Sequence, residues 1–437
     1  MKRLILITAF IFLCITLLKS WHYTSLYGGV DLRMRIVGAR LTEAGKSPYF
    51  HKWSPADGER LLFPSPRYER RVNGNVVTPA FSYLLIPYSR LGYSTIRYSW
   101  TIFQYLVLVS CFVLLMRGVR DKSKMLVPAS VCFFGLVTSD IWLYNIERGQ
   151  VYVIYAFVFC ILFRVYQKGS ERMKFFAGML CGLMIFLRPF FAVVAVPFFV
   201  NREKKWMTGW LAGLVLGVLV FVLPDVAIWK EYFAAMQVYA AELMRTDTAL
   251  ENFATPVFPS SIEGMDNVAE YRGFKAGGMN VVSAYLYSLG VRMRPVHGIL
   301  LYMAIVAGLC FFYLRNLGRQ TVAAHPVLFA FLLYILAEIC MVAPRGGYNL
   351  IQWILPVCLL SYVNAGKNWM QAALILGLLL LHDFPFQIKF GHDAGEAMLV
   401  LVLVYTLFSN YFPATGGLST PAERKLSTAA PDNSPIE

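Results

Sequence analysis

Apolar runs recur along most of the chain, and they constrain its fold more than any other feature of the sequence. Clear examples are LILITAFIFLCITLL from Leu4, WTIFQYLVLVSCFVLLM from Trp100, WLAGLVLGVLVFVL from Trp210 and MLVLVLVYTLF from Met398. A helix needs about 20 mostly apolar residues to cross the hydrocarbon core of a bilayer, and roughly 17 when it is little tilted. Because several runs are shorter, we expect some crossings to be broken helices or helices shielded by neighbours. With 15% of its residues charged, the chain cannot cover the surface of a soluble domain, and we predict an all-α polytopic membrane protein.

The net charge of +15 is compatible with nucleic-acid binding, but the placement of the basic residues argues against it. They gather in three short loops between apolar runs: Arg117, Arg120, Lys122 and Lys124; Arg164, Lys168, Arg172 and Lys174; and Arg202, Lys204 and Lys205. This is the positive-inside pattern, which predicts that these loops face the cytoplasm. We therefore expect membrane lipids rather than nucleic acid as partners, and a multi-pass protein of the bacterial inner membrane.

The N-terminus and the cysteines limit the possibilities further. The segment MKRLILITAFIFLCITLLKSW has the basic start and apolar run of a signal peptide but no small-x-small cleavage site, so we expect a retained signal anchor with the N-terminus inside. All eight cysteines fall in apolar segments. We therefore expect neither a disulfide framework nor a thiolate metal site.

Two long external segments interrupt the expected crossings. The first crossing, at about 3–20, leads to an external loop over residues 21–97, where helical spacing predicts an amphipathic helix over 32–44 that Gly45 ends. The second segment, residues 224–296, is expected to be partly helical or disordered. We predict a single transmembrane domain, residues 1–412, with about 11–13 crossings, and a disordered cytoplasmic tail over 413–437.

The other crossings follow from the remaining apolar runs. They are expected near 98–116, 125–138, 151–164, 206–223, 297–314, 326–343, 348–364, 368–383 and 395–412. Between them, SDIWLYNIERGQ (139–150) is expected to form an external turn, and two short arms hinged at Arg188-Pro189 a re-entrant pair or two short helices. The chain shows no internal repeat, which weighs against transporters built from inverted repeats.

Under this topology the unusual polar residues gather on the external side. They are Asp31, Arg33, Arg35 and Arg40 of the first loop; Glu147, Arg148 and Gln150 of the turn; Arg188 of the hinge; Arg345, Tyr348 and Asn349 of APRGGYNLIQW; and His382 and Asp383 of LLHDF. One carboxylate beside several cations suits a site that holds a phosphate-linked substrate while a proton leaves an acceptor hydroxyl. The cations would stabilise charge on the departing phosphate, and the carboxylate would act as general base.

Each of these residues also has a purely structural interpretation. Asp31 could be an N-terminal cap or a partner of the helix dipole. The helix 32–44 could lie in the membrane interface with its arginines on lipid headgroups. Arg148 could be an interfacial anchor, and Arg188 a snorkelling cation at a helix break. Glu338, the most deeply placed acid, could pair with an arginine of a neighbouring helix, and His382-Asp383 could cap a loop.

The order of the segments resembles that of a known family. The first crossing leads to an external Asp and a helix that ends before Pro-Tyr, in DLRMRIVGARLTEAGKSPYF. Then come an extended Thr-Pro-Ala-Phe in VTPAFSYLLIPYSRLG, Gly-Gln at the start of a crossing in ERGQVYVIYAFVF, and FFAGMLCGLMIFLRPFF. In these motifs the chain resembles glycosyltransferase family 87, which includes polyprenol-phosphate-mannose-dependent mannosyltransferases of the GT-C fold. The resemblance covers roughly residues 1–225 and, more loosely, 297–365.

The resemblance implies a GT-C-like helix bundle and a role for each polar residue. Asp31 matches the family's catalytic external-loop Asp and would deprotonate the acceptor hydroxyl. Arg188 stands where the family has a Lys before Pro and would hold the donor phosphate or lipid headgroup. The full assignment gives Arg188, Arg148, Gln150 and Arg345 to the donor, and Arg35, Tyr348, Asn349, His382 and Asp383 to the acceptor or the pocket walls.

The chain also departs from the family pattern. Leu32 replaces an aromatic residue, TPA replaces a double proline, and PRGGYNLIQW has no histidine where some members carry one. These departures leave open the identity of the sugar and the role of the late loop. Because Asp31 is a single acid rather than one of an Asp-x-Asp pair, we expect no metal ion, and no cofactor beyond the polyprenyl-phosphate sugar as co-substrate.

The predicted activity is transfer of a mannose-like hexose from a polyprenyl-phosphate donor to a glycan or lipid acceptor on the external face, with inversion. A retaining route would need a second carboxylate; Glu147 is the nearby candidate, and we expect it to be an ion-pair partner instead. The segment 224–296 would shape or cover the acceptor groove. The alternatives are a transporter or flippase of lipid-linked or anionic substrates, and a structural or assembly protein of the envelope whose loops are docking surfaces.

Overall fold

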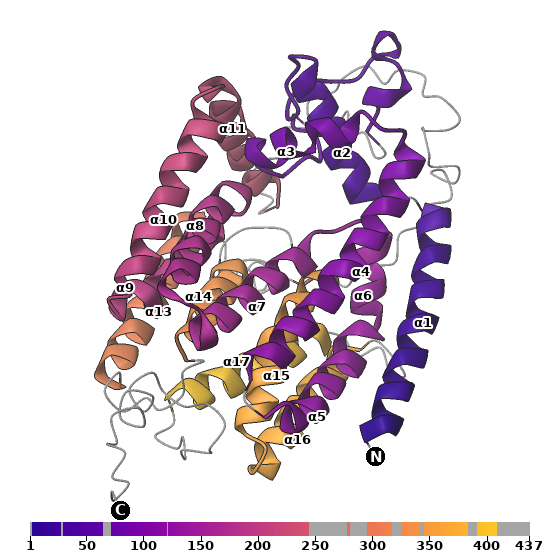
Figure 1. Ribbon diagram of the computed structural model, residues 1–437. Helices are drawn as coiled ribbons and strands as arrows, with labels where there is room; N and C mark the ends of the chain where they lie inside the picture. The colour runs from indigo at the N-terminus through magenta and orange to yellow at the C-terminus, as the bar shows by residue number, and fades with distance from the viewer. Residues whose placement is uncertain are drawn as a thin grey trace, which may run out of the picture.

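The computed structural model shows a bundle of helices that run side by side along most of its length (Figure 1). It describes residues 2–27, 29–63, 71–119, 121–243, 278–279, 295–316, 325–340, 345–382 and 391–408. Nearly all of these residues are helical, apart from the connections and one antiparallel pair of two-residue strands. The predicted fold class, an all-α polytopic membrane protein, is confirmed.

The helices follow one another closely along the chain. The α-helices up to the second long segment are α1 Lys2–Tyr27, α2 Val30–Glu43, α3 Pro79–Ser89, α4 Tyr93–Gly118, α5 Lys122–Cys132, α6 Asp140–Glu147, α7 Tyr152–Lys168, α8 Glu171–Leu187, α9 Val196–Val200, α10 Lys204–Gly217 and α11 Val226–Leu243. After it come α13 Pro295–Asn316, α14 His325–Cys340, α15 Ile354–Val363, α16 Asn368–Leu380 and α17 Gly391–Phe408. The 3₁₀ helices are η1 Pro55–Asp57, η2 Glu59–Leu61, η4 Pro189–Ala195 and η8 Gly347–Trp353, and the π-helices are η3 Phe133–Val137 and η5 Val218–Val222. Strand β1, Gly278–Met279, pairs with strand β2, Arg345–Gly346.

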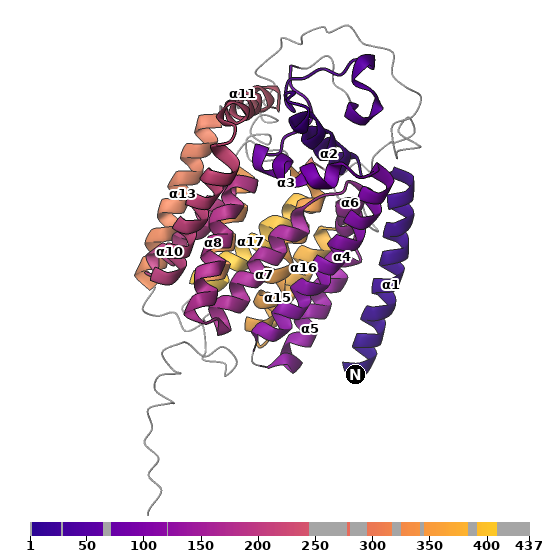
Figure 2. The ribbon, with the colours of Figure 1, turned by 45° about the horizontal axis from the view of Figure 1, so that its top comes forward.

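The two ends of the bundle differ in composition. Helices α2, α3 and α11 gather at the end opposite the N-terminus (Figures 1 and 2). The basic loops lie at the other end, where Lys168 Nζ donates to the carbonyls of Arg117 and Val119, both at 3.2 Å. At that same end Lys174 pairs with Glu203 at 3.3 Å. The acidic and basic residues of the first loop are therefore separated from the basic loops by the length of the bundle.

Few helices are long enough to cross a bilayer by themselves. Among the described residues, four helices pass by length and composition, namely Ile7–Ser25, Tyr93–Gly118, Lys204–Val222 and Val296–Arg315, and the bent pair Lys122–Val137 with Asp140–Glu147 would make a fifth. Shorter apolar helices run through Pro189–Val200, Pro326–Cys340, Gly347–Val363 and Asn368–Leu380. Broken and short helices were expected from the short apolar runs. They can exist within a bilayer because neighbouring helices satisfy the backbone N–H and C=O groups at their ends.

Two local expectations were wrong. The segment 139–150 is not a simple external turn: Asp140–Glu147 forms the helix α6, which meets the preceding helix at 57°, and the turn is confined to the residues after it. The Thr-Pro-Ala-Phe motif was expected to be extended, but only Thr78 is. Helix α3 begins at Pro79, because the missing N–H of a proline costs nothing in the first turn of a helix. The hinge at Arg188-Pro189 is confirmed as a break between α8 and the two short helices η4 and α9.

Glycines bring α8 and α10 into backbone contact. Gly178 and Gly182 of α8 face Gly209 and Gly213 of α10, so that a Cβ atom added at any of the four would meet main-chain atoms of the other helix at a distance no real Cβ adopts. Spacing of four residues puts each pair on one helix face. Close approach of this kind replaces the hydrophobic effect as the driving force between helices in lipid.

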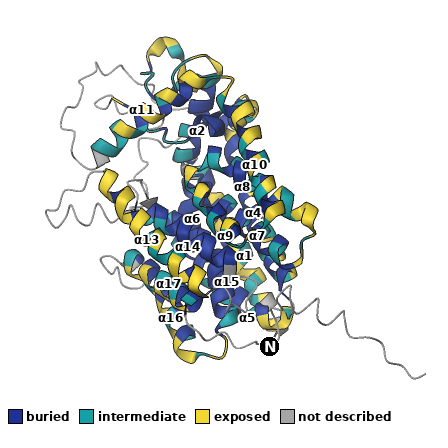
Figure 3. Cartoon of the chain, turned by 90° about the vertical axis from the view of Figure 1, so that its left-hand side faces the viewer, coloured by how far each residue is buried: buried dark blue, intermediate teal, exposed yellow. Residues whose placement is uncertain are grey.

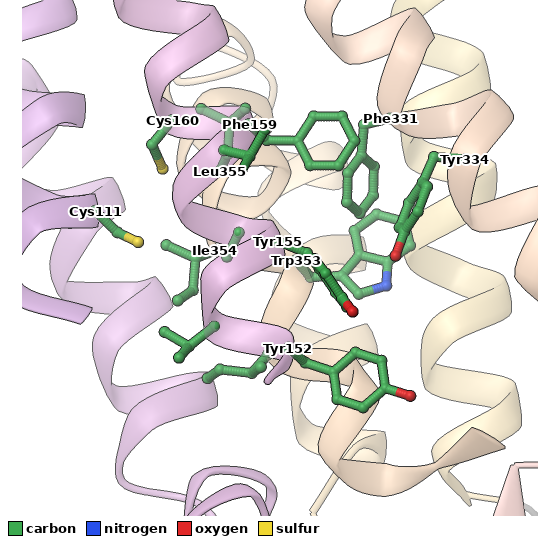
Figure 4. Close-up of a cluster of buried hydrophobic side chains, with 14 of the residues drawn as sticks. Cys111, Tyr152, Tyr155, Phe159, Cys160, Phe331, Tyr334, Trp353, Ile354 and Leu355 are labelled. Carbon is green, nitrogen blue, oxygen red and sulfur yellow. The ribbon is translucent and has the colours of Figure 1, made fainter. Parts of the chain in front are cut away.

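The core is aromatic, and the outer faces are apolar. Figure 4 shows Tyr155 and Phe159 of α7 beside Phe331 and Tyr334 of α14, with ring centroids of Phe159 and Phe331 5.1 Å apart. Exposed residues follow the outer faces of the helices (Figure 3). On α1 and α13 these exposed residues are mostly large and apolar, and only 17% of each spanning window is buried. Such faces suit contact with lipid tails.

The arginines at the two ends of α2 hold the first loop together. Arg33 donates to the carbonyl of Glu59 at 2.9 Å, and Arg40 donates to the carbonyls of Ser89 and Leu91 at 2.9 and 3.2 Å. Both side chains are buried. The interpretation that the arginines of this helix lie on lipid headgroups is therefore wrong, because their donors are used by carbonyl groups of the protein.

Asp57 organises the same loop. Burial by itself raises the pKa of Asp57, but hydrogen bonds from Lys46, from Ser54 and from His51 outweigh it and lower the pKa to about 2. A carboxyl whose pKa falls on folding contributes stability above its ordinary pKa of 3.8 and loses that contribution as the pH falls through about 2. The contacts of the loop therefore hold throughout the neutral range.

Of the second external segment the structure describes α11, which agrees with partial helicity, and β1. Residues 244–277 and 280–294 and the tail 413–437 lie outside the described residues. The expectations that the segment shapes an acceptor groove and that the tail is disordered stay predictions.

Candidate active site

The beginning of α2 and the turn after α6 form one unit. Gly29, at φ 73°, precedes α2 without a side-chain cap, and the main-chain N–H groups of Asp31 and Leu32 instead donate to the carbonyl of Arg148 at 3.0 and 3.1 Å. Gly149, at φ 63°, lies so close that an added Cβ atom would stand 2.5 Å from Cβ of Leu32. A side chain at position 149 would push the turn away from the helix. The Gly-Gln motif thus fixes the turn against the start of α2.

The carboxylate of Asp31 is held from the side by Arg148. Nε of Arg148 donates to Oδ2 at 2.8 Å and a terminal nitrogen donates to Oδ1 at 3.0 Å, which is the bidentate arrangement that planar guanidinium groups favour. Nε2 of Gln150 donates to Oδ2 as well. Asp31 is therefore not an N-cap, since its side chain bonds outward from the helix. It nevertheless sits in the first turn, where the helix dipole favours a negative charge.

One acceptor position remains open on Asp31. An ionised carboxylate offers about four lone-pair sites, two on each oxygen. Oδ2 uses both of its sites, for Arg148 and Gln150, whereas Oδ1 uses one. The side chain keeps 13% of its surface exposed. A hydroxyl group that reached Oδ1 could donate to it without displacing any existing partner.

Arg35 completes this group from the next turn of α2. Its guanidinium donates to the carbonyl of Gly149 at 2.8 Å and to Oε1 of Gln150. The side chain is buried and its charge lies over the ring of Phe81, at 5.9 Å. Asp31, Arg148, Gln150 and Arg35, which we call the Asp31 cluster, thus form a continuous set of hydrogen bonds between α2 and the turn.

Aromatic rings connect the Asp31 cluster to a second polar group. Arg148 lies 6.0 Å from the ring of Tyr348, and the rings of Tyr348 and Tyr152 are 5.5 Å apart. Arg188 in turn lies 5.5 Å from the ring of Tyr152 and 5.8 Å from that of Tyr155. Arg188 is therefore not a direct partner of Asp31. The two cations are separated by the rings of Tyr152 and Tyr348, which are tilted by 33° to each other.

The second group is a buried ion pair with amide and phenol partners. Arg188 donates to Oε1 of Glu338 at 2.6 Å, Tyr334 donates to the same oxygen at 2.7 Å, and Gln352 donates to Oε2 at 3.2 Å. Glu338 is fully buried, whereas Arg188 keeps 20% of its side chain exposed. Nε of Arg188 is buried and has no hydrogen-bond partner among the described residues. The interpretation that Glu338 pairs with an arginine of another helix is confirmed.

Removing Glu338 is expected to destabilise the protein strongly. Glu338→Ala leaves Arg188 without its counter-charge in the interior, which costs about 3–5 kcal/mol of unfolding free energy. Thermal unfolding of the purified protein in detergent measures the effect. The matched control is Glu43→Ala, because Glu43 pairs at 2.8 Å with an exposed arginine, Arg90, and such surface pairs are worth about 0–1 kcal/mol. Equal effects of the two changes would contradict a structural role for the buried pair.

The remaining predicted residues lie in different places. Asn349 is fully buried beside Tyr348, and in the described part of the chain neither atom of its amide has a hydrogen-bond partner. Arg345 is described through its main chain, which pairs with Met279. His382 lies at the end of α16, with Nε2 2.9 Å from the carbonyl of Gly135, so its described partner belongs to η3 and not to the Asp31 cluster. Asp383 lies outside the described residues.

Other residues of this region were not predicted. Tyr152, Tyr334 and Gln352 contact the charged groups, and His392 of α17 lies against Gly347, where an added Cβ would be 3.4 Å from its ring. A signal existed for two of them. Gln352 is a polar residue within the apolar run LIQWILP, and Tyr334 precedes Glu338 by four residues, one helical turn. Nothing local distinguishes His392 or Tyr152.

The described part of the chain holds no group of three or more His, Cys, Asp or Glu side chains arranged as metal ligands. The described partners of the Asp31 carboxylate are N–H donors, the charged guanidinium of Arg148 and the amide of Gln150. Independence from metal ions stays a prediction.

Comparison with known proteins gives one match. A model of glycosyltransferase family 87 matches residues 77–344, more than half of the 437 residues. The match includes Arg148, Gln150, Arg188 and Glu338, while Asp31 precedes it. No curated protein and no solved structure matches the chain.

Proposed function

This chain belongs to glycosyltransferase family 87, whose members are membrane glycosyltransferases, and we propose that it moves a mannose-like hexose from a polyprenyl-phosphate donor to a glycan or lipid acceptor. The observation that carries the proposal is the hydrogen bonding of the Asp31 carboxylate. Its carboxylate is held in one orientation by Arg148 and Gln150, and one lone pair of Oδ1 is open. This is what a general base for a hydroxyl needs.

In the proposed reaction the acceptor hydroxyl donates its hydrogen bond to Oδ1 of Asp31. As its oxygen attacks the anomeric carbon, the proton passes to Asp31, and the bond between the anomeric carbon and the donor phosphate oxygen breaks. Polyprenyl phosphate leaves with the bonding electrons. Because its phosphate is a workable leaving group, the enzyme needs positive charge there more than a general acid.

Arg188 is the proposed partner of that phosphate. It keeps 20% of its side chain exposed and donates to Glu338 through Nη2. A guanidinium group has further N–H donors, so its exposed part can bind a phosphate oxygen while Nη2 stays on Glu338. Arg148 and Gln150, by contrast, are engaged with Asp31, so we propose that they position the base rather than bind the donor directly.

Inversion follows from the single carboxylate. A retaining enzyme normally places a second carboxylate about 5–5.5 Å from the first, as nucleophile. The described partners of Asp31 are an arginine and an amide, and Glu147 is buried at the end of α6. We therefore keep Asp31 as base in a direct displacement.

The proposed location of the reaction is the external side of the membrane. Asp31 lies at the end of the bundle that carries α2, α3 and α11, and the lysines and arginines of the short loops lie at the other end (Figure 2). The positive-inside rule assigns that basic end to the cytoplasm. The donor would then be used after it has been moved to the outer leaflet.

A direct assay tests transfer against transport. Purified protein in lipid nanodiscs is incubated with radiolabelled polyprenyl-phosphate mannose and octyl mannoside as a synthetic acceptor. The expected result is a labelled disaccharide together with free polyprenyl phosphate in equal amounts. Movement of the intact donor across vesicles, with no release of polyprenyl phosphate for any polyprenyl-phosphate hexose, would contradict the proposal and favour a flippase.

A further inference from the structure

Gln150 lies between two charged groups that fix the direction of its amide. On one side Arg35, which has donors and no acceptors, meets Oε1. On the other side Asp31, which accepts when ionised, meets Nε2. In the reversed orientation, the NH₂ group of Gln150 would face the N–H donor of Arg35 and its oxygen would face the carboxylate of Asp31. Neither pair could form a hydrogen bond. A single orientation therefore satisfies both neighbours.

Arg35 is held in turn by the protein around it. One branch of its guanidinium donates to the carbonyl of Gly149 at 2.8 Å, so the other branch is directed at Gln150. The side chain is 9% exposed and Gln150 is 3% exposed. In such an environment a charged hydrogen bond is strong and its geometry is well defined.

We infer that Arg35 is a positioning residue that acts on Asp31 through Gln150. By holding Oε1, Arg35 keeps the NH₂ group of Gln150 on Oδ2, and this reserves Oδ1 as the oxygen that accepts the proton. The inference rests on the proposed function of Asp31 as general base. It differs from the sequence-based assignment of Arg35 to the acceptor.

Loss of the bridge is expected to lower kcat without weakening the binding of the acceptor. When the NH₂ group of Gln150 no longer holds Oδ2, the carboxylate of Asp31 can turn away from the acceptor hydroxyl, and a misplaced base slows the chemical step. An interaction of this kind matters only in the transition state, so its loss lowers kcat and leaves KM unchanged.

The test measures kcat and KM for octyl mannoside, at saturating polyprenyl-phosphate mannose, in three variants, Arg35→Met, Gln150→Met and the double variant. Each single change is expected to lower kcat about tenfold and to leave KM unchanged. The double variant should lower kcat no further, because both changes interrupt the same bridge. Arg90→Met, which alters an exposed arginine of the same loop, is the matched control and should leave kcat unchanged.

Three results would overturn the inference. An unchanged kcat with a raised KM for octyl mannoside in Arg35→Met would make Arg35 an acceptor-binding residue. An unchanged kcat with a lowered unfolding temperature would make it a structural one. A further loss of kcat on adding Arg35→Met to Gln150→Met would show that Arg35 acts by its charge and not through the amide.

Two further controls complete the design. If Arg35→Met does not accumulate in the membrane, Gln150→Met carries the test, since it retains the charge of Arg35 and removes the bridge. Asp31→Asn separates the proposed function from the inference about Arg35. An active Asp31→Asn enzyme would contradict the proposed function itself. An inactive Asp31→Asn enzyme together with an unchanged kcat in Gln150→Met would contradict the inference about Arg35 alone.

Discussion

Replacing Asp31 with asparagine is expected to lower the rate of glycosyl transfer by about 10²–10⁴-fold, the contribution of a positioned general base. Asparagine has the size of aspartate and keeps one oxygen for Arg148 or Gln150, but it cannot take a proton from the acceptor. The protein should therefore reach the membrane in normal amounts. Release of free polyprenyl phosphate from the radiolabelled donor measures the loss, with yield and thermal unfolding recorded on the same preparations.

The matched control for this change is Asp121→Asn. Asp121 caps α5 at the opposite end of the bundle by accepting from the main-chain N–H groups of Ser123 and Lys124 at 3.0 and 3.1 Å. Asparagine caps a helix about as well as aspartate, so both activity and stability should be unchanged. An Asp31→Asn enzyme as active as this control would remove Asp31 from the role of base.

Replacing Gly209 with alanine is expected to cause the largest loss of stability from a single methyl group. The new Cβ atom would collide with the main-chain carbonyl of Phe175 on α8, and a carbonyl cannot move aside as a flexible side chain can. Helices α8 and α10 would have to separate along their contact, at a cost of about 3 kcal/mol. Thermal unfolding in detergent should fall by several degrees, and activity should follow it, because α8 leads directly to Arg188.

Gly308→Ala is the matched control, since Gly308 also lies in an apolar helix, α13, but an added Cβ there would meet no described atom within 4 Å outside the backbone of its own helix. There alanine should be neutral or slightly stabilising, because glycine within a helix costs about 1 kcal/mol relative to alanine. A Gly209→Ala protein as stable as Gly308→Ala would mean that α8 and α10 are not packed through their glycines.

The fold class could be predicted because apolar runs and charged loops report directly on a bilayer. The helix within residues 32–44 and its end at Gly45 could also be predicted from the sequence. Gly45 adopts φ 68°, a conformation that favours glycine and that ends a helix. The hinge at Arg188 followed from the proline after it. In each case the cause lies within a few residues of the effect, which is the condition for reading structure from one sequence.

The roles within the Asp31 cluster could not be read in that way. Arg33, Arg35 and Arg40 are alike in sequence, yet Arg33 and Arg40 bond loop carbonyls and Arg35 bonds Gln150. The difference depends on partners 20 to 115 residues away along the chain. The pairing of Asp31 with Arg148, 117 residues apart, was expected only from the shared side of the membrane. Long-range contacts of this kind need the folded arrangement of the helices.

The segment 139–150 was expected to be a turn but contains helix α6, and the prediction failed for a similar reason. Asp140–Glu147 is too short to be recognised as a membrane helix by itself, and it follows, at a bend of 57°, the helix Lys122–Val137, whose last turn is the π-helix Phe133–Val137. Tertiary packing stabilises such short helices more than intrinsic propensity does. Because α6 ends at Glu147, it delivers Arg148 and Gln150 to the start of α2.

The most direct test of the central claim is a structure with a non-transferable phosphonate analogue of the donor and an acceptor bound together. The predicted result places the phosphonate on the exposed part of Arg188 and the acceptor hydroxyl within about 2.6–3.2 Å of Oδ1 of Asp31, directly or through one water. A phosphonate bound among the basic loops at the other end of the bundle, or an acceptor hydroxyl out of reach of Asp31, would contradict the proposed chemistry.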